Sequence, residues 1–255
     1  MSKRETAISV RGLTVKYGEN TILENVSFDV YKGELFVIAG GSGCGKSTLL
    51  RHIIGLETPK SGKVIFDGTD STSLNEDEVE VLRRRIGMLF QGSALFGSMT
   101  IAENVSLPLS EFTTLSGSTI DLLVRMKLGM VDLAGYENHY PSELSGGMKK
   151  RAGIARAMAL EPEMLFLDEP SAGLDPVTTA ELDVLIRKLN EGVGTTMIIV
   201  THELETIFNV SHRVIMLDKE TKGIIAEGNA RELKEYSSNT KVRNFFNRQI
   251  EEKKN

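Results

Sequence analysis

A glycine-rich stretch that starts at residue 40 indicates chemistry more directly than any other part of the sequence. It matches the pattern G-x-x-x-x-G-K-[ST] and follows an apolar run at residues 34–39. Glycines let successive backbone N–H groups point into one concavity, which binds phosphate together with the N-terminus of the next helix. In this pattern Lys46 reaches the β- and γ-phosphates, and the Ser47 hydroxyl is a ligand of Mg²⁺. We therefore expect a nucleotide to be bound by Gly41, Ser42, Gly43, Cys44, Gly45, Lys46, Ser47 and Thr48. The alternative is a glycine turn that serves only strand–helix packing.

Two adjacent carboxylates end a second apolar run. Residues 164–167 read Met-Leu-Phe-Leu, and Asp168 and Glu169 follow. Because open α/β sheets bind ligands at the carboxyl ends of their strands, we expect these acids beside the phosphate loop. Asp168 suits the Mg²⁺ shell, and Glu169 suits a general base that orients and deprotonates water. The simpler alternative is that both acids cap the next helix.

A third motif reads Leu144-Ser145-Gly146-Gly147-Met148 and precedes a helical pattern. Ser145 can cap that helix, and the exposed glycine backbone can donate hydrogen bonds to a phosphate. With this motif the chain resembles the ATP-binding cassette (ABC) ATPases, whose signature L-S-G-G-Q stands ahead of the Asp-Glu strand. In that family the phosphate belongs to ATP held by the other subunit. The resemblance implies that two copies of the chain enclose two ATP molecules head to tail.

Further matches run in family order over residues 8–228. The resemblance implies that Tyr17 stacks on adenine, and that Gln91 touches Mg²⁺ and the attacking water and couples to the membrane part. It also implies that Asp175 lies in a loop crossing the dimer and that His202 contacts the γ-phosphate. Taken alone, a tyrosine beside a turn usually packs, and a lone histidine is more often structural. Together with Lys46 and Glu169, these matches predict the catalytic residues of an ATPase.

Departures from the family pattern favour one subfamily. Met148 replaces the usual glutamine of the signature, and residues 90–96 and 103–109 read FQGSALF and ENVSLPL. These features resemble the cassettes of MCE-associated (Mla-type) lipid transporters. The resemblance implies ATP-driven movement of phospholipid across a bacterial envelope, with a membrane permease and an MCE-type lipid-binding protein. The alternative is the ATPase subunit of an amino-acid, ion or other small-solute transporter.

The elements that must position these residues follow from the apolar patterning. Residues 7–15 and 22–30 alternate apolar and polar side chains and predict a strand pair, and short apolar runs alternate with helical patterns later in the chain. This predicts an α/β fold: a P-loop (RecA-like) core with an antiparallel β subdomain and an inserted α-helical subdomain. The expected boundaries are 6–228 for the ATPase domain and 229–255 for a C-terminal helical extension. Within the domain we expect the β part at 6–32, the core at 33–91 and 158–228, and the helical part at 92–157.

Shorter predictions concern individual segments. Pro108, with Gly135 and Pro141, is expected to break the helical part. The basic run Lys149-Lys150-Arg151 is interpreted as a solvated helix face, with a contact to phosphate or the opposing subunit as the alternative. A maleimide is expected to inhibit through Cys44, with protection by ATP. The C-terminal segment is expected to form a short helix and a loose terminus. Its apolar edge at Val242, Phe245 and Phe246 either packs internally or docks on the partner cassette.

The composition of the chain indicates where the protein is located and which classes of partner it can bind. The chain has 255 residues, a net charge of −5 and one cysteine, which is typical of a globular protein without a disulfide framework. Its longest apolar runs fall short of the roughly 20 residues that a membrane helix requires, and the N-terminus lacks the pattern of a signal peptide. We expect a cytoplasmic protein held at the inner membrane by the permease. The acidic balance argues against a nucleic-acid partner.

Overall fold

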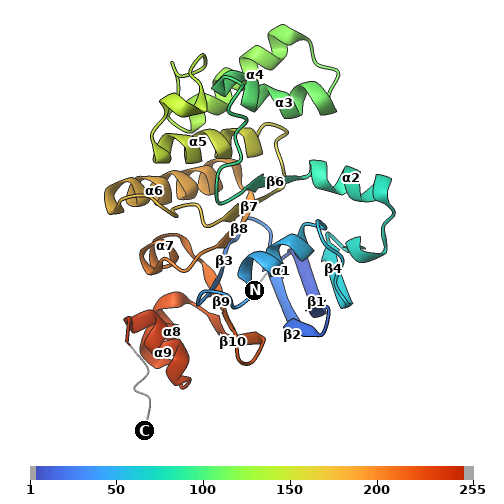
Figure 1. Cartoon of the computed structure of the whole chain (residues 1–255), viewed down its shortest axis with the longest axis vertical. Helices are drawn as coiled ribbons and strands as arrows, with labels where there is room; N and C mark the ends of the chain where they lie inside the picture. Colours follow the sequence, from blue (N-terminus) through green and yellow to red (C-terminus); the bar gives the residue numbers. More distant parts are fainter. Residues whose placement is uncertain (1–3, 250–255) are drawn as a thin grey trace.

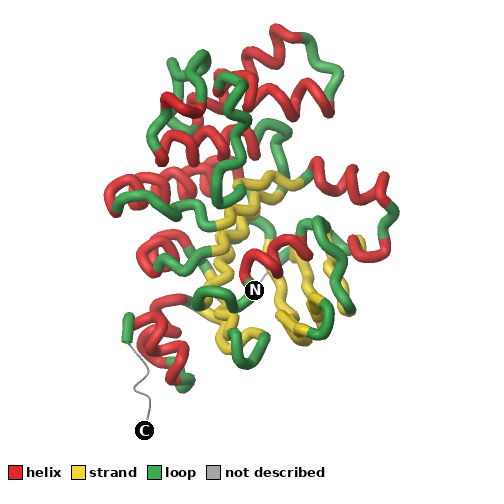
Figure 2. Tube along the Cα trace, in the orientation of Figure 1, coloured by secondary structure: helices red, strands yellow, loops and turns green. Residues whose placement is uncertain are grey.

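Two β-sheets of different kinds organise the chain, as the computed structural model shows for residues 4–249 (Figures 1 and 2). A four-stranded sheet has the order β2-β1-β4-β5, and its neighbouring strands run antiparallel. A six-stranded sheet has the order β10-β9-β3-β8-β7-β6, in which only the edge strand β10 runs antiparallel to its neighbour. The predicted fold class, α/β with an antiparallel part, is confirmed. The strands are β1 Thr6–Tyr17, β2 Asn20–Tyr31, β3 Leu35–Gly40, β4 Ser61–Phe66, β5 Thr69–Asp70, β6 Ile86–Leu89, β7 Met164–Asp168, β8 Thr196–Val200, β9 Arg213–Asp218 and β10 Gly223–Gly228.

Helices cover both faces of the six-stranded sheet, with α3, α4 and α5 toward one end of the molecule and α8 and α9 at the other (Figure 1). Helix α1 contacts β3, β7 and β8, and its apolar side chains share one core cluster with the four-stranded sheet. The other face of the sheet shares a second cluster with α3 to α7 and α9. The helices are α1 Lys46–Ile53, α2 Glu76–Arg84, α3 Ile101–Phe112, α4 Gly117–Met130, α5 Gly146–Ala157, α6 Pro176–Val193, α7 Leu204–Val210, α8 Ala230–Tyr236 and α9 Thr240–Asn247, with short 3-10 turns at Ser71–Ser73 and Pro141–Glu143.

The central strand β3 explains why the sequence has continuous apolar runs. It pairs in parallel with β8 and β9, and all six of its residues are buried. Leu35 and Val37 face one core cluster, whereas Phe36 and Ile38 face the other. A strand that is covered on both faces cannot alternate apolar and polar residues. This burial fixes the end of β3, and with it the position of the glycine-rich loop.

Two predictions for the helical part and the C-terminus are wrong. Helix α3 continues through Pro108. Proline removes one backbone hydrogen bond, but Ile101, Val105 and Leu109 are buried on one face of the helix and their packing keeps it continuous. The C-terminal segment forms two helices, α8 and α9, in place of one. The loose terminus that we expected falls on residues 250–255, outside the described part.

The apolar edge of α9 packs within its own chain. Val242 and Phe246 are fully buried and belong to the core cluster, and the Phe246 ring lies 5.9 Å from the ring of Phe208 in α7. Phe245 is partly buried against the same cluster. The default prediction of a packed terminal helix is therefore confirmed. The idea that Val242 and Phe246 dock on a partner cassette is wrong, because their surfaces are already covered.

Residues 4–249 contain no helix that is both long enough and apolar enough to cross a membrane.

Candidate active site

The glycine-rich loop connects the end of β3 to the start of α1 and has a backbone that requires glycine. Gly40, Gly43 and Gly45 have φ values of 145°, 72° and 96°, which L-residues with side chains rarely adopt. A Cβ at Gly40 would lie 2.5 Å from the carbonyl oxygen of Leu217. No side chain caps the first turn of α1, so its backbone N–H groups remain available to an anion.

Lys46 lies over this loop. Its Nζ donates hydrogen bonds to the carbonyl oxygens of Gly40 and Gly41, at 2.9 and 3.0 Å. The side chain is buried, and the loop carbonyls hold its ammonium group at the mouth of the loop. A cation held in this way meets a phosphate without a large loss of side-chain entropy.

The loop opens into a cavity of about 350 Å³ that brings together residues from distant parts of the sequence. Gln91 follows β6, Glu169 follows β7 and His202 follows β8, so all three enter from the carboxyl ends of parallel strands. This is the edge at which open α/β sheets bind ligands. The cavity is lined by Ser42, Gly43, Gly45, Lys46, Ser47, Thr48, Gln91, Glu169 and His202.

Ser47 and Asp168 form the oxygen pair that fits a magnesium ion. The Ser47 hydroxyl donates to Asp168 Oδ1 at 3.1 Å. Burial raises the pKa of Asp168 and the charge of Glu169 adds to the rise, while the Ser47 hydrogen bond opposes it. No group of three or more His, Cys, Asp or Glu residues in the part from 4 to 249 could hold a metal. Since Mg²⁺ keeps several waters and binds substrate phosphates, two protein oxygens suit it as part of a nucleotide complex.

Glu169 has an unusual backbone and one free carboxylate oxygen. Its φ of 48° lies in the left-handed region, which costs a non-glycine residue about 1–2 kcal/mol. Glu169 Oε1 lies 2.8 Å from His202 Nδ1, whereas Oε2 is buried and has no hydrogen-bond partner. The imidazole is 54% exposed and the carboxylate 10%, so the pair spans from the core to the cavity. One carboxylate oxygen is thus oriented by His202, and the other is buried without a partner.

The basic run after the signature motif behaves differently from its predicted role. Lys150 is 5% exposed, and its Nζ donates to the carbonyl oxygens of Gln91 and Glu169. The interpretation as a solvated helix face is therefore wrong for Lys150, and its burial lowers the pKa of the ammonium group. Arg151 pairs with the surface carboxylates of Asp132 and Glu181, but its side chain is only 14% exposed, so the interpretation fails for this residue too.

A second cation of α5 also binds backbone carbonyls. Arg156 donates to the carbonyl oxygens of Ser93 and Ala94, at 2.9 and 2.7 Å. Both of these residues have positive φ, 61° and 49°. The roles of Lys150 and Arg156 could not be predicted from the sequence. Both cations bind backbone carbonyl groups, and such contacts involve no acidic residue whose spacing would indicate a pair.

The structure does not support a nucleotide contact by the Cys44 side chain. The residue is 2% exposed and its Sγ packs beneath Gly40, within the core cluster that includes α1. Burial raises the pKa of the thiol. Only the backbone of Cys44 can contribute to phosphate binding, so the predicted inhibition by a maleimide loses its physical basis.

Tyr17 lies outside the phosphate cavity. It ends β1 with a side chain that is 46% exposed, and its hydroxyl donates to Glu57. Its ring centroid is 6.5 Å from that of His52 in α1. The hydroxyl is therefore anchored while one face of the ring stays accessible. The contact of Glu57 with Tyr17 could not be predicted from the sequence, because Glu57 follows α1 without a recognisable motif.

The signature residues lie at the N-terminus of α5 and do not line the cavity of their own chain. The Ser145 hydroxyl accepts from the Met148 N–H at 3.3 Å, and Gly146 is exposed. Asp175 caps α6 by accepting from the N–H groups of Val177 and Thr178, and its pKa is lowered first by a hydrogen bond from the Thr178 hydroxyl and then by these backbone bonds. The structure thus leaves Ser145, Gly146, Gly147 and Asp175 apart from the phosphate loop.

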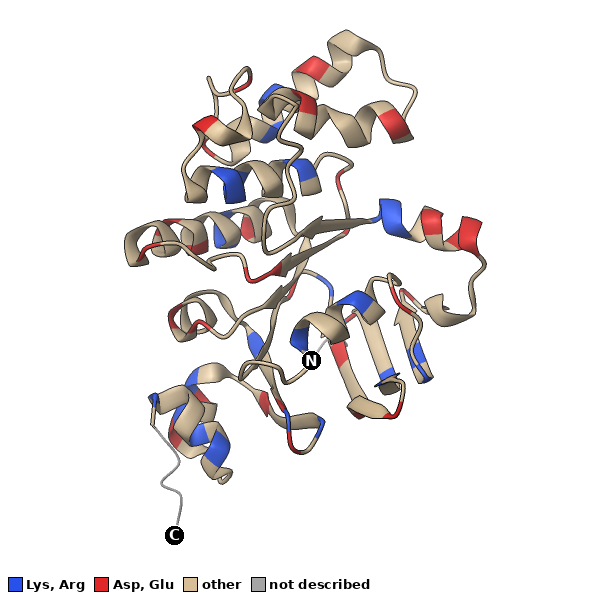
Figure 3. Cartoon of the chain, in the orientation of Figure 1, with Lys and Arg blue, Asp and Glu red and all other residues tan. Residues whose placement is uncertain are grey.

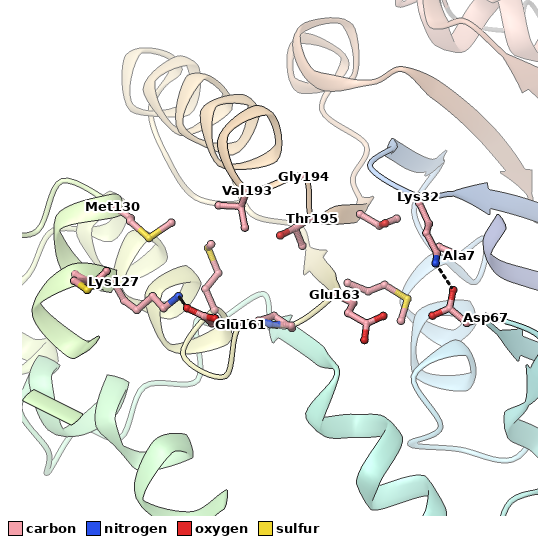
Figure 4. Close-up of a pocket in the computed structure, with 15 residues that line it drawn as sticks. Ala7, Lys32, Asp67, Lys127, Met130, Glu161, Glu163, Val193, Gly194 and Thr195 are labelled. Atoms are coloured by element: carbon pink, nitrogen blue, oxygen red, sulfur yellow. Dashed lines mark hydrogen bonds and ion pairs between the residues drawn. The ribbon is translucent and has the colours of Figure 1, made fainter. Parts of the chain in front are cut away.

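A larger cavity of about 540 Å³ lies at the other edge of the parallel sheet (Figure 4). It is bordered by Met130 of α4, Val193 at the end of α6 and the Lys32–Asp67 ion pair. Met164 and Thr196, which begin β7 and β8, also line it. Ligands of open α/β sheets bind at the opposite, carboxyl edge, so this cavity is not a candidate for the nucleotide.

Comparison with known proteins decides the family. The family model described as ABC transporter matches residues 23–172. The chain belongs to the ABC transporter family. It is accordingly an ATP-binding, ATP-hydrolysing subunit whose activity is coupled to transport, as the signature motif predicted.

Relatives of this ABC ATPase match over almost its whole length. The probable ribonucleotide transport ATP-binding protein mkl of Mycobacterium leprae is 42% identical, covering 94% of this chain and 69% of the relative. The intermembrane phospholipid transport system ATP-binding protein MlaF of Escherichia coli is 39% identical, covering 94% and 88%. The solved dimeric post-hydrolysis state of the cassette MJ0796 with ADP and Pi is 34% identical, with a TM-score of 0.79 over 87% of this chain and 98% of that one. The cbiO1 cassette of Clostridium perfringens is 29% identical, with a TM-score of 0.82 over 90% and 95%.

Proposed function

We propose that this ABC ATPase hydrolyses ATP with Glu169 as the general base. The observation that carries the proposal is the cavity in which Glu169 and His202 face the phosphate loop. The Glu169 carboxylate accepts a proton from water, while His202 orients it through Oε1 and contacts the γ-phosphate. Lys46 releases its loop carbonyls and neutralises phosphate charge. A base positioned in this way contributes about 10²–10⁴-fold to a rate.

In this proposal Mg²⁺ binds together with ATP, as part of a magnesium–nucleotide complex. Ser47 and Asp168, whose oxygen atoms lie 3.1 Å apart, would hold the ion, and Gln91, which follows β6, would offer a further oxygen. When bound, Mg²⁺ neutralises the charge that develops on the β- and γ-phosphate oxygens. Tyr17 offers its accessible ring face to adenine, since its hydroxyl is anchored by Glu57.

The working unit is a head-to-tail dimer of two copies of the chain. Ser145 and Gly146 are exposed at the start of α5 and lie outside the chain's own cavity, which leaves them free to meet a nucleotide held by a second copy. A Cβ at Gly146 would lie 3.2 Å from Leu174, so the signature and the loop before Asp175 form one surface. The related cassette MJ0796 was solved as a dimer with ADP and Pi. We propose residues 6–228 as the unit that dimerises.

The membrane partner docks near Gln91. Phe90 and Phe96 are exposed large apolar side chains that flank Gln91 along the chain, a position suited to a permease segment. Docking there places this subunit at the cytoplasmic face of the inner membrane. The helical part that holds the loop, residues 92–157, then transmits closure of the dimer to the permease.

Phospholipid is the cargo that we favour. MlaF relatives named for intermembrane phospholipid transport are 39–40% identical and are matched over 86–88% of their length. Together with the signature LSGGMKKR, this favours a lipid system with an MCE-type binding protein. The mkl relative is named as a probable ribonucleotide transport protein, so the small-solute alternative takes the form of a nucleotide cargo.

Reconstitution distinguishes these cargoes. The chain is co-purified with its permease and soluble partner in proteoliposomes, and transfer of a fluorescent phospholipid and of a radiolabelled ribonucleotide is measured with and without ATP. ATP-dependent transfer of the phospholipid alone is expected. Transfer of the ribonucleotide without phospholipid would refute the lipid assignment but not the ATPase.

A further inference from the structure

Lys150 connects two loops of the active site through their backbones. Its Nζ donates to the Gln91 carbonyl oxygen at 2.5 Å and to the Glu169 carbonyl oxygen at 3.1 Å. The side chain is buried, and its ammonium group is held by these backbone carbonyl oxygens. A buried cation is costly unless it is fully engaged by polar groups, so both hydrogen bonds matter to the folded state.

The two carbonyl groups belong to residues that follow neighbouring strands. Gln91 follows β6 and Glu169 follows β7, and the two strands pair in parallel. Glu169 is in the left-handed conformation, so a donor on its carbonyl group holds a backbone that would otherwise relax. Lys150 leaves both side chains free to act in the cavity while it fixes the peptide units from which they project.

Lys150 is also less than one turn from the signature glycine Gly147, because an α-helix has about 3.6 residues per turn. Helix α5 packs against β6 at backbone distance: a Cβ at Gly87 would lie 2.3 Å from the Ala157 carbonyl oxygen, and one at Gly153 would lie 2.6 Å from Leu89. So close a contact leaves little room for α5 to slide independently. A displacement at the start of the helix therefore reaches Lys150 and the two carbonyl groups that it holds.

We propose that Lys150 is a positioning residue that links the two nucleotide sites of the dimer. When the signature of one chain engages ATP held by its partner, Lys150 moves with α5 and sets the backbone of Glu169 and Gln91 in its own site. The inference rests on the proposed function, in which the signature faces the partner's ATP and Glu169 is the base. It adds a physical route by which occupation of one site prepares the other for hydrolysis.

Three variants, with a fourth in reserve, separate this role from simple packing. Lys150→Met keeps the apolar stem and removes the donors, whereas Lys150→Arg keeps a cation that can donate to both carbonyl groups. Lys149→Met is the matched control, because Lys149 is an adjacent, partly exposed lysine of the same helix. Lys150→Leu fills the same volume with a branched side chain and replaces Lys150→Met if that variant is unfolded at the assay temperature.

The measurement is ATP hydrolysis by the full chain as a function of ATP concentration. For Lys150→Met we expect kcat to fall at least about 10-fold while KM stays within about 2-fold of the parent value. This pattern is typical of an interaction that stabilises the transition state and not the bound substrate. The Hill coefficient is expected to fall from near 2 toward 1, since the two sites lose their coupling. Lys150→Arg restores both quantities, and Lys149→Met resembles the parent.

Two results would overturn the inference. One is Lys150→Met with the kcat and Hill coefficient of the parent. The other is a lowered kcat with an unchanged Hill coefficient and no rescue by arginine, which indicates packing alone. Glu169→Gln is assayed in parallel: if it turns over ATP like the parent, the assignment of the base has failed, which is a separate outcome.

Discussion

His202 Nδ1 lies 2.8 Å from Glu169 Oε1, while the second carboxylate oxygen of Glu169 is buried without a partner. A partly exposed imidazole thus orients a buried carboxylate from the cavity side. The hydrogen bond fixes Oε1, and Oε2 is the carboxylate oxygen that remains without a partner.

Replacement of His202 by alanine is expected to reduce ATP turnover by about 10²-fold or more, because the base loses its orienting partner. ATP binding should change little, since the phosphate loop is untouched. Phosphate release measures turnover, and fluorescence of a bound nucleotide analogue measures binding. Glu203→Gln is the control, as Glu203 lies 3.7 Å from the other ring nitrogen. Equal losses in the two variants would contradict the specific role of the Glu169 contact.

Asp183 predicts a pH dependence of stability. Burial raises the pKa of this carboxyl in α6, and its Oδ1 has no hydrogen-bond partner. The folded chain therefore keeps its proton to higher pH than the unfolded chain, so this group lowers the free energy of unfolding as pH rises from the unfolded pKa through the folded pKa. Asp183→Asn is expected to raise Tm at neutral pH by a few degrees, given about 2–4 °C per kcal/mol for a chain of this size.

Thermal unfolding at a series of pH values tests whether Asp183 lowers the stability as the pH rises. The gain from Asp183→Asn should shrink as the pH falls below the folded pKa, and ATP hydrolysis should be unchanged. Asp132→Asn, at an exposed carboxylate, is the control. A lower Tm for Asp183→Asn at neutral pH would show that the charge is stabilising and would reject this account.

Cys44 is expected to react slowly with a maleimide. The thiol is buried and its pKa is raised by burial, so the reactive thiolate is scarce and shielded. Mass spectrometry should find labelling of the folded chain at least about 10-fold slower than in denaturant, with ATP hydrolysis retained meanwhile. Rapid labelling with ATP protection would instead place the thiol at the nucleotide.

Phe246→Ala is expected to destabilise the single chain by about 3–5 kcal/mol, as for a buried aromatic side chain in a core. Urea unfolding measures the loss, and Phe245→Ala, at a partly buried position, should cost less. Light scattering with ATP reports the dimer. A Phe246→Ala chain with parent stability but a weakened dimer would revive the partner-docking idea.

The sequence predicted those parts of the fold that depend on local patterns. Apolar runs predict the buried strands β3, β7 and β8, and the motif G-x-x-x-x-G-K-[ST] predicts the phosphate loop, three of whose glycines adopt positive φ. By contrast, Pro108 lies within a helix because the packing of Ile101, Val105 and Leu109 outweighs one lost hydrogen bond. Local propensity cannot foresee that balance.

Contacts with backbone atoms were harder to predict than contacts between charges. Lys150 sits in a run of three basic residues that resembles a solvated surface, yet it is buried against two carbonyl groups. Cys44 lies within a binding motif while its thiol faces the core. In both cases the direction of the side chain is set by tertiary packing, which no residue spacing in the sequence encodes.

The most direct test of the central claim is steady-state ATP hydrolysis by Glu169→Gln, measured together with its oligomeric state. We expect turnover to fall by about 10²–10⁴-fold, the contribution of a general base, while ATP converts the chain into a persistent dimer. The amide keeps the size of the side chain but cannot accept the proton of water. Turnover close to that of the parent chain would contradict the assignment of Glu169 as the base.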